Sequence, residues 1–111
     1  YWWAPKGEEA SWLTRQYQHS PRYPVRFWLQ AGRFETRGSD GGIYANTLEF
    51  GRVLSEKGYK VSFHPSSSGH DYVAWCEGLI NGMRDLSGLA LKREPATPDP
   101  AQRQILDGAQ R

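Results

Sequence analysis

Two short segments of the sequence carry side chains that could do chemistry together, and each follows a stretch rich in apolar and aromatic residues. Gly32-Arg33-Phe34-Glu35 comes after the first stretch, and Gly69-His70-Asp71 comes after the second. A carboxylate that accepts the Nδ1–H of an imidazole fixes its tautomer and leaves Nε2 free as a general base toward a nucleophile. Glu35 and His70 are therefore the candidate acid and base, provided that the fold brings them together.

Other side chains compete for these roles. Asp40, flanked by glycine, is an alternative acid, although a Gly-rich turn explains it equally well. Asp71 has the type and position of a helix N-cap, which requires no catalytic role. His64 and His70 could be imagined as a metal pair, but no further ligands follow at a sensible spacing. His19 stands among polar turn residues and is predicted to lie at the surface.

The elements that must position these residues alternate between strand and helix. Residues 25–31 alternate apolar and polar side chains with the period of a strand, and residues 43–57 have helical periodicity. A short strand is predicted over residues 59–63, followed by a loop over 64–69 (HPSSSG). A last helix is predicted over residues 72–86. A further short helix is expected near residues 11–18.

Each of the two longer helices has an apolar stripe. The first consists of Ile43, Thr47, Phe50 and Leu54, and the second of Tyr72, Cys76, Leu79, Met83 and Leu86. Both stripes follow helical spacing and are predicted to pack on the sheet. The lone cysteine, Cys76, is accordingly expected to be a core residue.

The order strand, loop, helix, strand, loop, helix predicts an α/β fold with a parallel sheet and right-handed crossovers. Because ligand sites in such sheets gather at the carboxyl ends of the strands, Glu35 and His70 should arrive at one edge. Two strands are few for a parallel sheet, which normally has helices over both faces. Residues 1–88 are therefore expected to be one edge of a larger fold, with a polar, Pro-containing tail over 89–111.

Composition narrows the function class. The net charge of +2 over 111 residues gives no argument for nucleic acid or an anionic membrane surface as a partner. A single cysteine allows no disulfide within the chain and no cysteine-based zinc site. No stretch has the length of a membrane span. The expected compartment is the cytoplasm, with a periplasmic or secreted location as the alternative.

The chain resembles the C-terminal portion of enterochelin (ferric-enterobactin) esterases and their relatives, the feruloyl esterases and S-formylglutathione hydrolase. Four pieces carry the resemblance in order: Tyr1-Trp2-Trp3, residues 24–35, residues 48–58 (LEFGRVLSEKG), and Gly69-His70-Asp71 with Trp75 and Leu79. The single motifs are weak, whereas their order and spacing are fairly specific. One departure is Ser68, which stands where the family often has a further glycine before the His-Asp pair.

The resemblance implies the C-terminal part of an α/β-hydrolase fold, with His70 as the general base, Glu35 as the acid and a serine nucleophile in a preceding part that is absent here. That chain order, Ser, acid, His, is the order of α/β-hydrolases. Trp2 and Trp3 either line the substrate pocket or plug the sheet edge, and Arg33 either pairs with an anionic substrate or is solvated. No cofactor is implied.

The implied activity is hydrolysis of a small-molecule ester, best matched by a siderophore lactone such as ferric enterobactin. The alternatives are a feruloyl or acetyl ester on a carbohydrate, an inactive truncated remnant, and a small interaction domain. The sequence contains no Gly-x-Ser-x-Gly motif, so we expect no turnover from these 111 residues without the missing N-terminal half of the fold.

Overall fold

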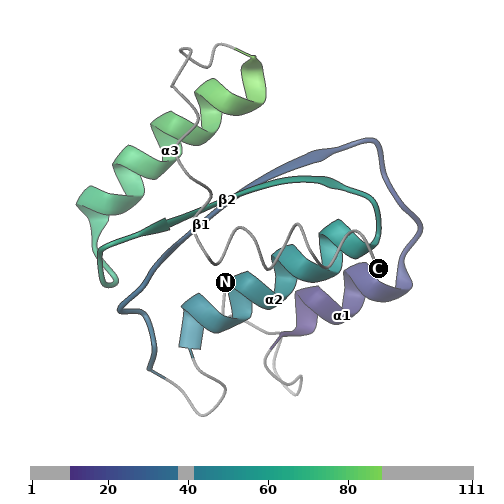
Figure 1. Ribbon diagram of the computed structural model, residues 1–111, viewed down its shortest axis with the longest axis horizontal. Coiled ribbons are helices and arrows are strands. Elements are labelled where there is room, and N and C mark those ends of the chain that lie inside the picture. The colour runs from purple at the N-terminus through teal and green to yellow at the C-terminus, as the bar shows by residue number, and fades with distance from the viewer. Residues whose placement is uncertain (1–10, 38–41, 89–111) are drawn as a thin grey trace.

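The computed structural model of the chain describes residues 11–37 and 42–88, and these form a small α/β domain (Figure 1). The elements in chain order are α1 (Trp12–His19), β1 (Arg26–Gly32), α2 (Gly42–Glu56), β2 (Lys60–Ser66) and α3 (Tyr72–Ser87). The predicted order of elements is therefore confirmed, with bounds that differ by at most three residues. The tail over 89–111 lies outside the described residues.

The two strands pair in parallel, as the strand-helix-strand order predicts. Their register runs from Arg26 opposite Lys60 to Gly32 opposite Ser66. Helices α1 and α2 lie on one face of this sheet and α3 lies on the other (Figure 1). The loops that follow β1 and β2 consequently leave the sheet at the same end, which is where the two candidate chemical segments lie.

The core lies between the sheet and the helices α1 and α2. Leu54 and Phe63 are completely buried, and Phe50, Val53 and Tyr59 are nearly so. Much of the packing is edge-to-face contact between aromatic rings, an arrangement that aromatic quadrupoles favour. The predicted stripe of α2 faces this core, since its Thr47, Phe50 and Leu54 are buried. This packing anchors β1 and β2, and thereby the start of each candidate loop.

Strand β2 is longer than the sequence predicts. We expected a strand over residues 59–63 and a break at His64-Pro65, but β2 continues to Ser66, with Pro65 opposite Ala31. Proline lacks an N–H and is tolerated where a strand has no neighbour to receive one. Within the described residues β2 pairs only with β1, so Pro65 sits in an edge strand. The consequence is that the loop before His70 begins later and is tighter than expected.

A second prediction is wrong, because the apolar stripe of helix α3 does not pack on the sheet. Leu79 and Met83 are 65% and 63% exposed, and Cys76, predicted to be a core residue, is exposed as well. The helix instead turns its two buried glycines, Gly78 and Gly82, toward β1.

The glycines bring the helix axis unusually close to the strand. A Cβ at Gly78 would overlap the Gln30 side chain, and one at Gly82 would stand 2.8 Å from the Trp28 ring. The Gln30 amide also donates to the Ala74 carbonyl of α3 (3.2 Å). This close approach determines which face of α3 points away from the sheet, and it is the reason that the apolar stripe is left exposed.

No described helix is long and apolar enough to cross a membrane.

Candidate active site

Glu35 is held in place by a compact turn at the end of β1. Its backbone N–H donates to the Gly32 carbonyl (3.0 Å), and its own carbonyl accepts from the N–H of Tyr44 in the first turn of α2 (3.1 Å). Its carboxylate folds back on the same turn, where Oε2 accepts from the Gly32 N–H (2.7 Å). Three backbone hydrogen bonds therefore fix the position of this side chain before any contact with the histidine.

Two glycines make this turn possible. A Cβ at Gly32 would stand 2.3 Å from the carbonyl oxygen of Ser68, because the loops after β1 and β2 pass each other there. Gly42 has φ of 75°, a left-handed conformation that favours glycine. A Cβ added at this position would stand 2.6 Å from the Glu35 carbonyl oxygen, so a larger residue would not fit. The loops are joined across this gap by the N–H of Phe34, which donates to Ser68 O (3.1 Å).

His70 reaches the site from the second loop, immediately before α3. Asp71 is the N-cap of that helix, since its Oδ1 accepts from the Ala74 N–H (2.9 Å), and this structural role agrees with the sequence prediction. His70 immediately precedes this N-cap, and its imidazole lies against the turn that holds Glu35.

The structure brings the two predicted residues into contact. His70 Nδ1 lies 2.7 Å from Glu35 Oε1. An ionised carboxylate can only accept hydrogen bonds, so the hydrogen between the two groups belongs to Nδ1. The Glu35 side chain is only 4% exposed, whereas that of His70 is 56% exposed. The carboxylate is thus shielded from competing water while the imidazole remains accessible.

This geometry leaves Nε2 of His70 as a free acceptor. With Nδ1–H held by Glu35, the neutral imidazole carries its lone pair on Nε2, and the carboxylate stabilises the imidazolium that forms when Nε2 takes a proton. The pair is therefore arranged as a general base with its orienting acid.

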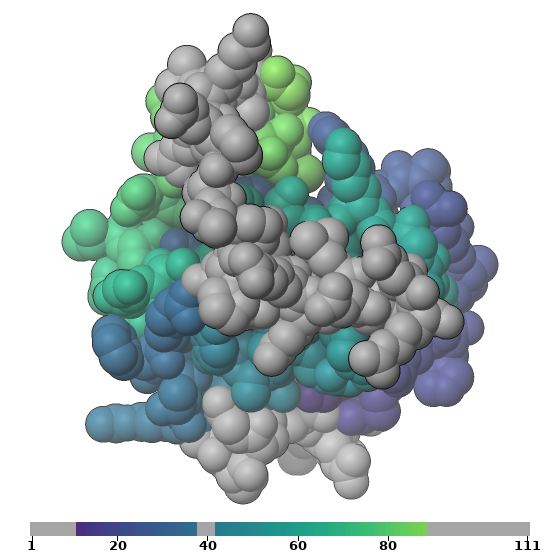
Figure 2. Space-filling view, viewed as in Figure 1, coloured from purple at the N-terminus to yellow at the C-terminus, as the bar shows by residue number. Residues whose placement is uncertain are grey.

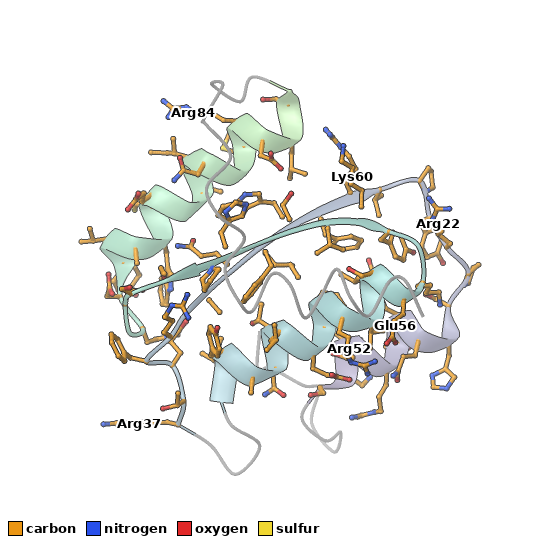
Figure 3. All side chains as sticks on the ribbon, viewed as in Figure 1. Arg22, Arg37, Arg52, Glu56, Lys60 and Arg84 are labelled. Carbon is orange, nitrogen blue, oxygen red and sulfur yellow. The ribbon has the colours of Figure 1, made fainter. Side chains whose placement is uncertain are left out.

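Of the predicted substrate-binding residues, Arg33 alone lies within the described part of the chain. Arg33 lies in the turn after β1 and is exposed, with its N–H donating to Ser66 O (2.9 Å). Arg37, a little further along the same loop, extends outward from the domain (Figure 3). Trp2, Trp3 and Asp40 lie outside the described residues, so their predicted roles stay predictions.

The other two histidines lie apart from this pair. His64 stacks on the Trp28 ring with a centroid separation of 5.0 Å, and His19 is exposed on α1 as expected. Among residues 11–37 and 42–88 there is no group of three His, Cys, Asp or Glu side chains that could hold a metal. The hydroxyls of Ser66 and Ser68 hydrogen-bond to each other (2.7 Å).

Two contacts of the site were missed by reasoning from the sequence. Trp75 packs against the His70 ring, and the Gly32 N–H occupies the second carboxylate oxygen of Glu35. The contact with Trp75 could have been predicted from spacing. His70 is the residue before the N-cap Asp71 and Trp75 is the fourth residue of the helix, and these two positions commonly contact each other. The second depends on the path of the loop, for which the sequence offers no comparable signal.

Comparisons of the chain with protein-family models, with curated proteins and with solved structures find no match.

In the space-filling view, α3 lies at the upper left of the visible face and the loop after β1 at its lower left edge (Figure 2). Exposed aromatic side chains accompany both segments, since Phe34 is 70% exposed and Tyr72 is 80% exposed. Phe34 and Tyr72 therefore add exposed aromatic surface to the chain segments that carry Glu35 and His70.

Proposed function

We propose that this chain supplies the histidine and the acid of a serine-type carboxylic ester hydrolase with an α/β-hydrolase fold. The observation that carries the proposal is the 2.7 Å contact between His70 Nδ1 and a buried Glu35 carboxylate, with the rest of the imidazole exposed. That arrangement matches the acid-histidine half of a hydrolytic triad and supports the proposal. Its location at the carboxyl ends of two adjacent parallel strands agrees with the site location of open α/β folds.

The proposed reaction is acyl transfer in two steps. A serine hydroxyl attacks the ester carbonyl while Nε2 of His70 takes its proton, and the imidazolium then returns that proton to the departing alcohol. In the second step Nε2 takes a proton from water as the water oxygen attacks the acyl-serine, and the imidazolium then returns that proton to the serine oxygen as the bond between serine and acyl group breaks and the acid is released. Glu35 holds Nδ1–H throughout and stabilises the imidazolium in both steps.

The serine is proposed to come from a segment outside these 111 residues, because the sequence has no Gly-x-Ser-x-Gly turn. Two features support a larger fold. Within the described residues the sheet has only two strands, so β1 has one edge without a partner. The apolar stripe of α3 is exposed, and contiguous exposed apolar surface commonly marks an interface.

The proposed substrate class is a siderophore ester or lactone, and this choice depends on the resemblance to enterochelin esterases. A feruloyl or acetyl ester of a carbohydrate is the alternative within the same chemistry. The exposed Phe34 and Tyr72 near the site are compatible with a flat aromatic substrate, which would stack on such rings.

The experiment begins with the coding sequence immediately upstream of Tyr1. If an in-frame extension contains a Gly-x-Ser-x-Gly turn, the extended protein is purified and assayed on aryl esters and on ferric enterobactin. His70→Ala is expected to lower kcat/KM by about 10²–10⁴-fold, because general acid-base catalysis contributes about that much. His19→Ala, which removes an exposed histidine of α1, is the matched control and should leave kcat/KM unchanged.

The 111-residue chain by itself should show no turnover. His70-dependent hydrolysis by this chain alone would contradict the proposal that the nucleophile lies elsewhere. An upstream stop codon or an unrelated upstream sequence would mean that Glu35 and His70 are remnants, and the enzymatic proposal would then be abandoned.

A further inference from the structure

Trp75 contacts the candidate base from the first turns of α3. The rings of His70 and Trp75 lie edge to face, with centroids 4.4 Å apart and planes inclined by 81°. Trp75 is itself in edge-to-face contact with Tyr72 (5.1 Å). The imidazole thus meets a carboxylate at Nδ1 and an aromatic ring beside it.

The positions of these residues along the chain explain the contact. Asp71 is the N-cap of α3, so His70 is the residue before the cap and Trp75 is the fourth residue of the helix. In many helices these two positions hold apolar side chains whose contact fixes the direction in which the chain enters the helix. Here an imidazole takes the first of the two positions, so the same contact fixes the direction of the ring.

His70 needs a second constraint because one hydrogen bond does not immobilise an exposed ring. More than half of its side chain is exposed, so rotation about its side-chain bonds into solvent is sterically open on one side. Glu35 cannot follow such a rotation, since its other carboxylate oxygen is held by the Gly32 N–H. A ring that swings out therefore loses the carboxylate, and with it the preference for the Nδ1–H tautomer.

We propose that Trp75 is a positioning residue for His70, which holds the imidazole against Glu35 so that Nδ1 stays protonated and Nε2 faces outward. This inference deepens the proposed function and depends on it for its catalytic meaning. The positioning itself is a property of the 111-residue chain and can be measured without any catalysis.

The test is the tautomer of His70, read from the ¹⁵N chemical shifts of its ring nitrogens in the purified 111-residue chain near pH 9, where ordinary imidazoles, with a pKa of about 6.5, are neutral. The wild-type chain should show His70 as the Nδ1–H form. Trp75→Leu keeps an apolar, helix-compatible side chain but removes the ring. It should shift the ratio of the two tautomers toward Nε2–H by about 2- to 10-fold, the range expected from losing one aromatic contact.

Two further variants separate positioning from a general effect on the helix. Trp75→Phe retains an aromatic edge and should restore the wild-type tautomer ratio. Leu79→Ala removes an exposed apolar side chain one turn further along α3 and should leave the ratio unchanged. Far-UV circular dichroism of each variant reports whether α3 is still formed.

The outcomes distinguish this inference from the function. A wild-type chain without the Nδ1–H form overturns the pairing of Glu35 and His70, and the role of Trp75 falls with it. If the wild-type chain has the Nδ1–H form and Trp75→Leu keeps the same tautomer ratio, the role of Trp75 alone is overturned. The role is also overturned if Leu79→Ala changes the ratio as much as Trp75→Leu does. In an active extended protein, Trp75→Leu should lower kcat with little change in KM, and Trp75→Phe should recover it.

Discussion

At the scale of single residues, the site depends on backbone groups more than on side chains. Glu35 has one carboxylate oxygen on the Gly32 N–H and the other on His70, so its two acceptors have different partners. The backbone bond fixes the carboxylate, and the carboxylate then fixes the imidazole. Substitution of a residue that carries no chemistry, Gly32, should therefore disturb the candidate base.

Gly32→Ala should destabilise the domain by about 1–3 kcal/mol, the usual range for an overpacked site, because its Cβ would stand 2.3 Å from the Ser68 carbonyl. Gly69→Ala is the matched control in the neighbouring loop, since a Cβ there meets nothing within 4 Å. It should change stability by no more than about 0.5 kcal/mol. Urea unfolding measures both, and equal effects of the two variants would mean that the loops do not pass as closely as described.

The sequence predicted Glu35 and His70 as a pair because two strands of a parallel sheet deliver their following loops to one edge. It could not choose between Glu35 and Asp40 from composition alone, since both follow β1 in a polar loop. In the structure Glu35 makes a buried contact with His70, whereas Asp40 lies outside the described residues. That contact depends on the path of the turn at Gly32, where the backbone passes close to Ser68, and no local sequence pattern encodes this path.

At the scale of elements, α2 combines a buried face with a charged outer face. Arg52 lies between Glu49 and Glu56 on the exposed side of the helix, bonds to Glu49 Oε1 at 2.6 Å, and also pairs with Glu56 (Figure 3). The hydrogen bond from Arg52 lowers the pKa of Glu49 below its ordinary value near 4.5, and the hydrogen bond to Glu49 raises the pKa of Arg52. These side chains are more than 40% exposed, so solvent weakens the interaction.

A lowered pKa in the folded state gives a definite pH dependence. Glu49 contributes stability above its unfolded pKa, and that contribution is lost as the pH falls through the folded value. Arg52→Gln should therefore lower the free energy of unfolding by about 0.3–0.5 kcal/mol at pH 7 and by less near pH 3. Urea unfolding at the two pH values measures this. Arg84→Gln, on α3, should show no such change, and an Arg52→Gln effect that is independent of pH would exclude the proposed cause.

The bounds of the helices were largely predictable, whereas the orientation of α3 was not. Periodicity located α2 and α3 to within one residue, and Asp71 located the start of α3 correctly. The apolar stripe of α3 suggested the wrong buried face, because Gly78 and Gly82 allow a closer approach to β1 than any apolar side chain. The sequence feature that could have predicted this packing is the pair of glycines four residues apart, Gly78 and Gly82. They mark the helix face that lies close to the sheet.

At the scale of the whole molecule, the apolar side chains are distributed unevenly between the two faces of the sheet. The face covered by α1 and α2 holds the buried core, while the helix on the opposite face leaves Leu79, Ile80 and Met83 exposed. This asymmetry agrees with the proposal that further strands and helices of a larger fold belong beside β1 and α3. It also predicts where substitutions matter for the stability of the chain by itself.

Leu54→Ala should destabilise the 111-residue chain by about 2–5 kcal/mol, because Leu54 is completely buried and its loss leaves a cavity. Leu79→Ala makes the same chemical change at a side chain that is 65% exposed, and should cost no more than about 0.5 kcal/mol. The two midpoints of urea unfolding give the comparison. A Leu79→Ala cost as large as that of Leu54→Ala would show that α3 buries its apolar stripe.

In the proposed site, a buried Glu35 carboxylate sets the tautomer of an accessible His70, and the variant Glu35→Gln changes only the group that does so. In this variant the amide oxygen must accept the Gly32 N–H, which leaves the NH₂ group facing Nδ1 of His70. Nδ1 must then accept a hydrogen bond, so the imidazole proton moves to Nε2, where it blocks proton abstraction. Ring ¹⁵N chemical shifts of the neutral histidine in wild type and Glu35→Gln are therefore the decisive measurement. We expect Nδ1–H in the wild-type chain and Nε2–H in Glu35→Gln. The same tautomer in both proteins would mean that Glu35 does not set the tautomer of His70.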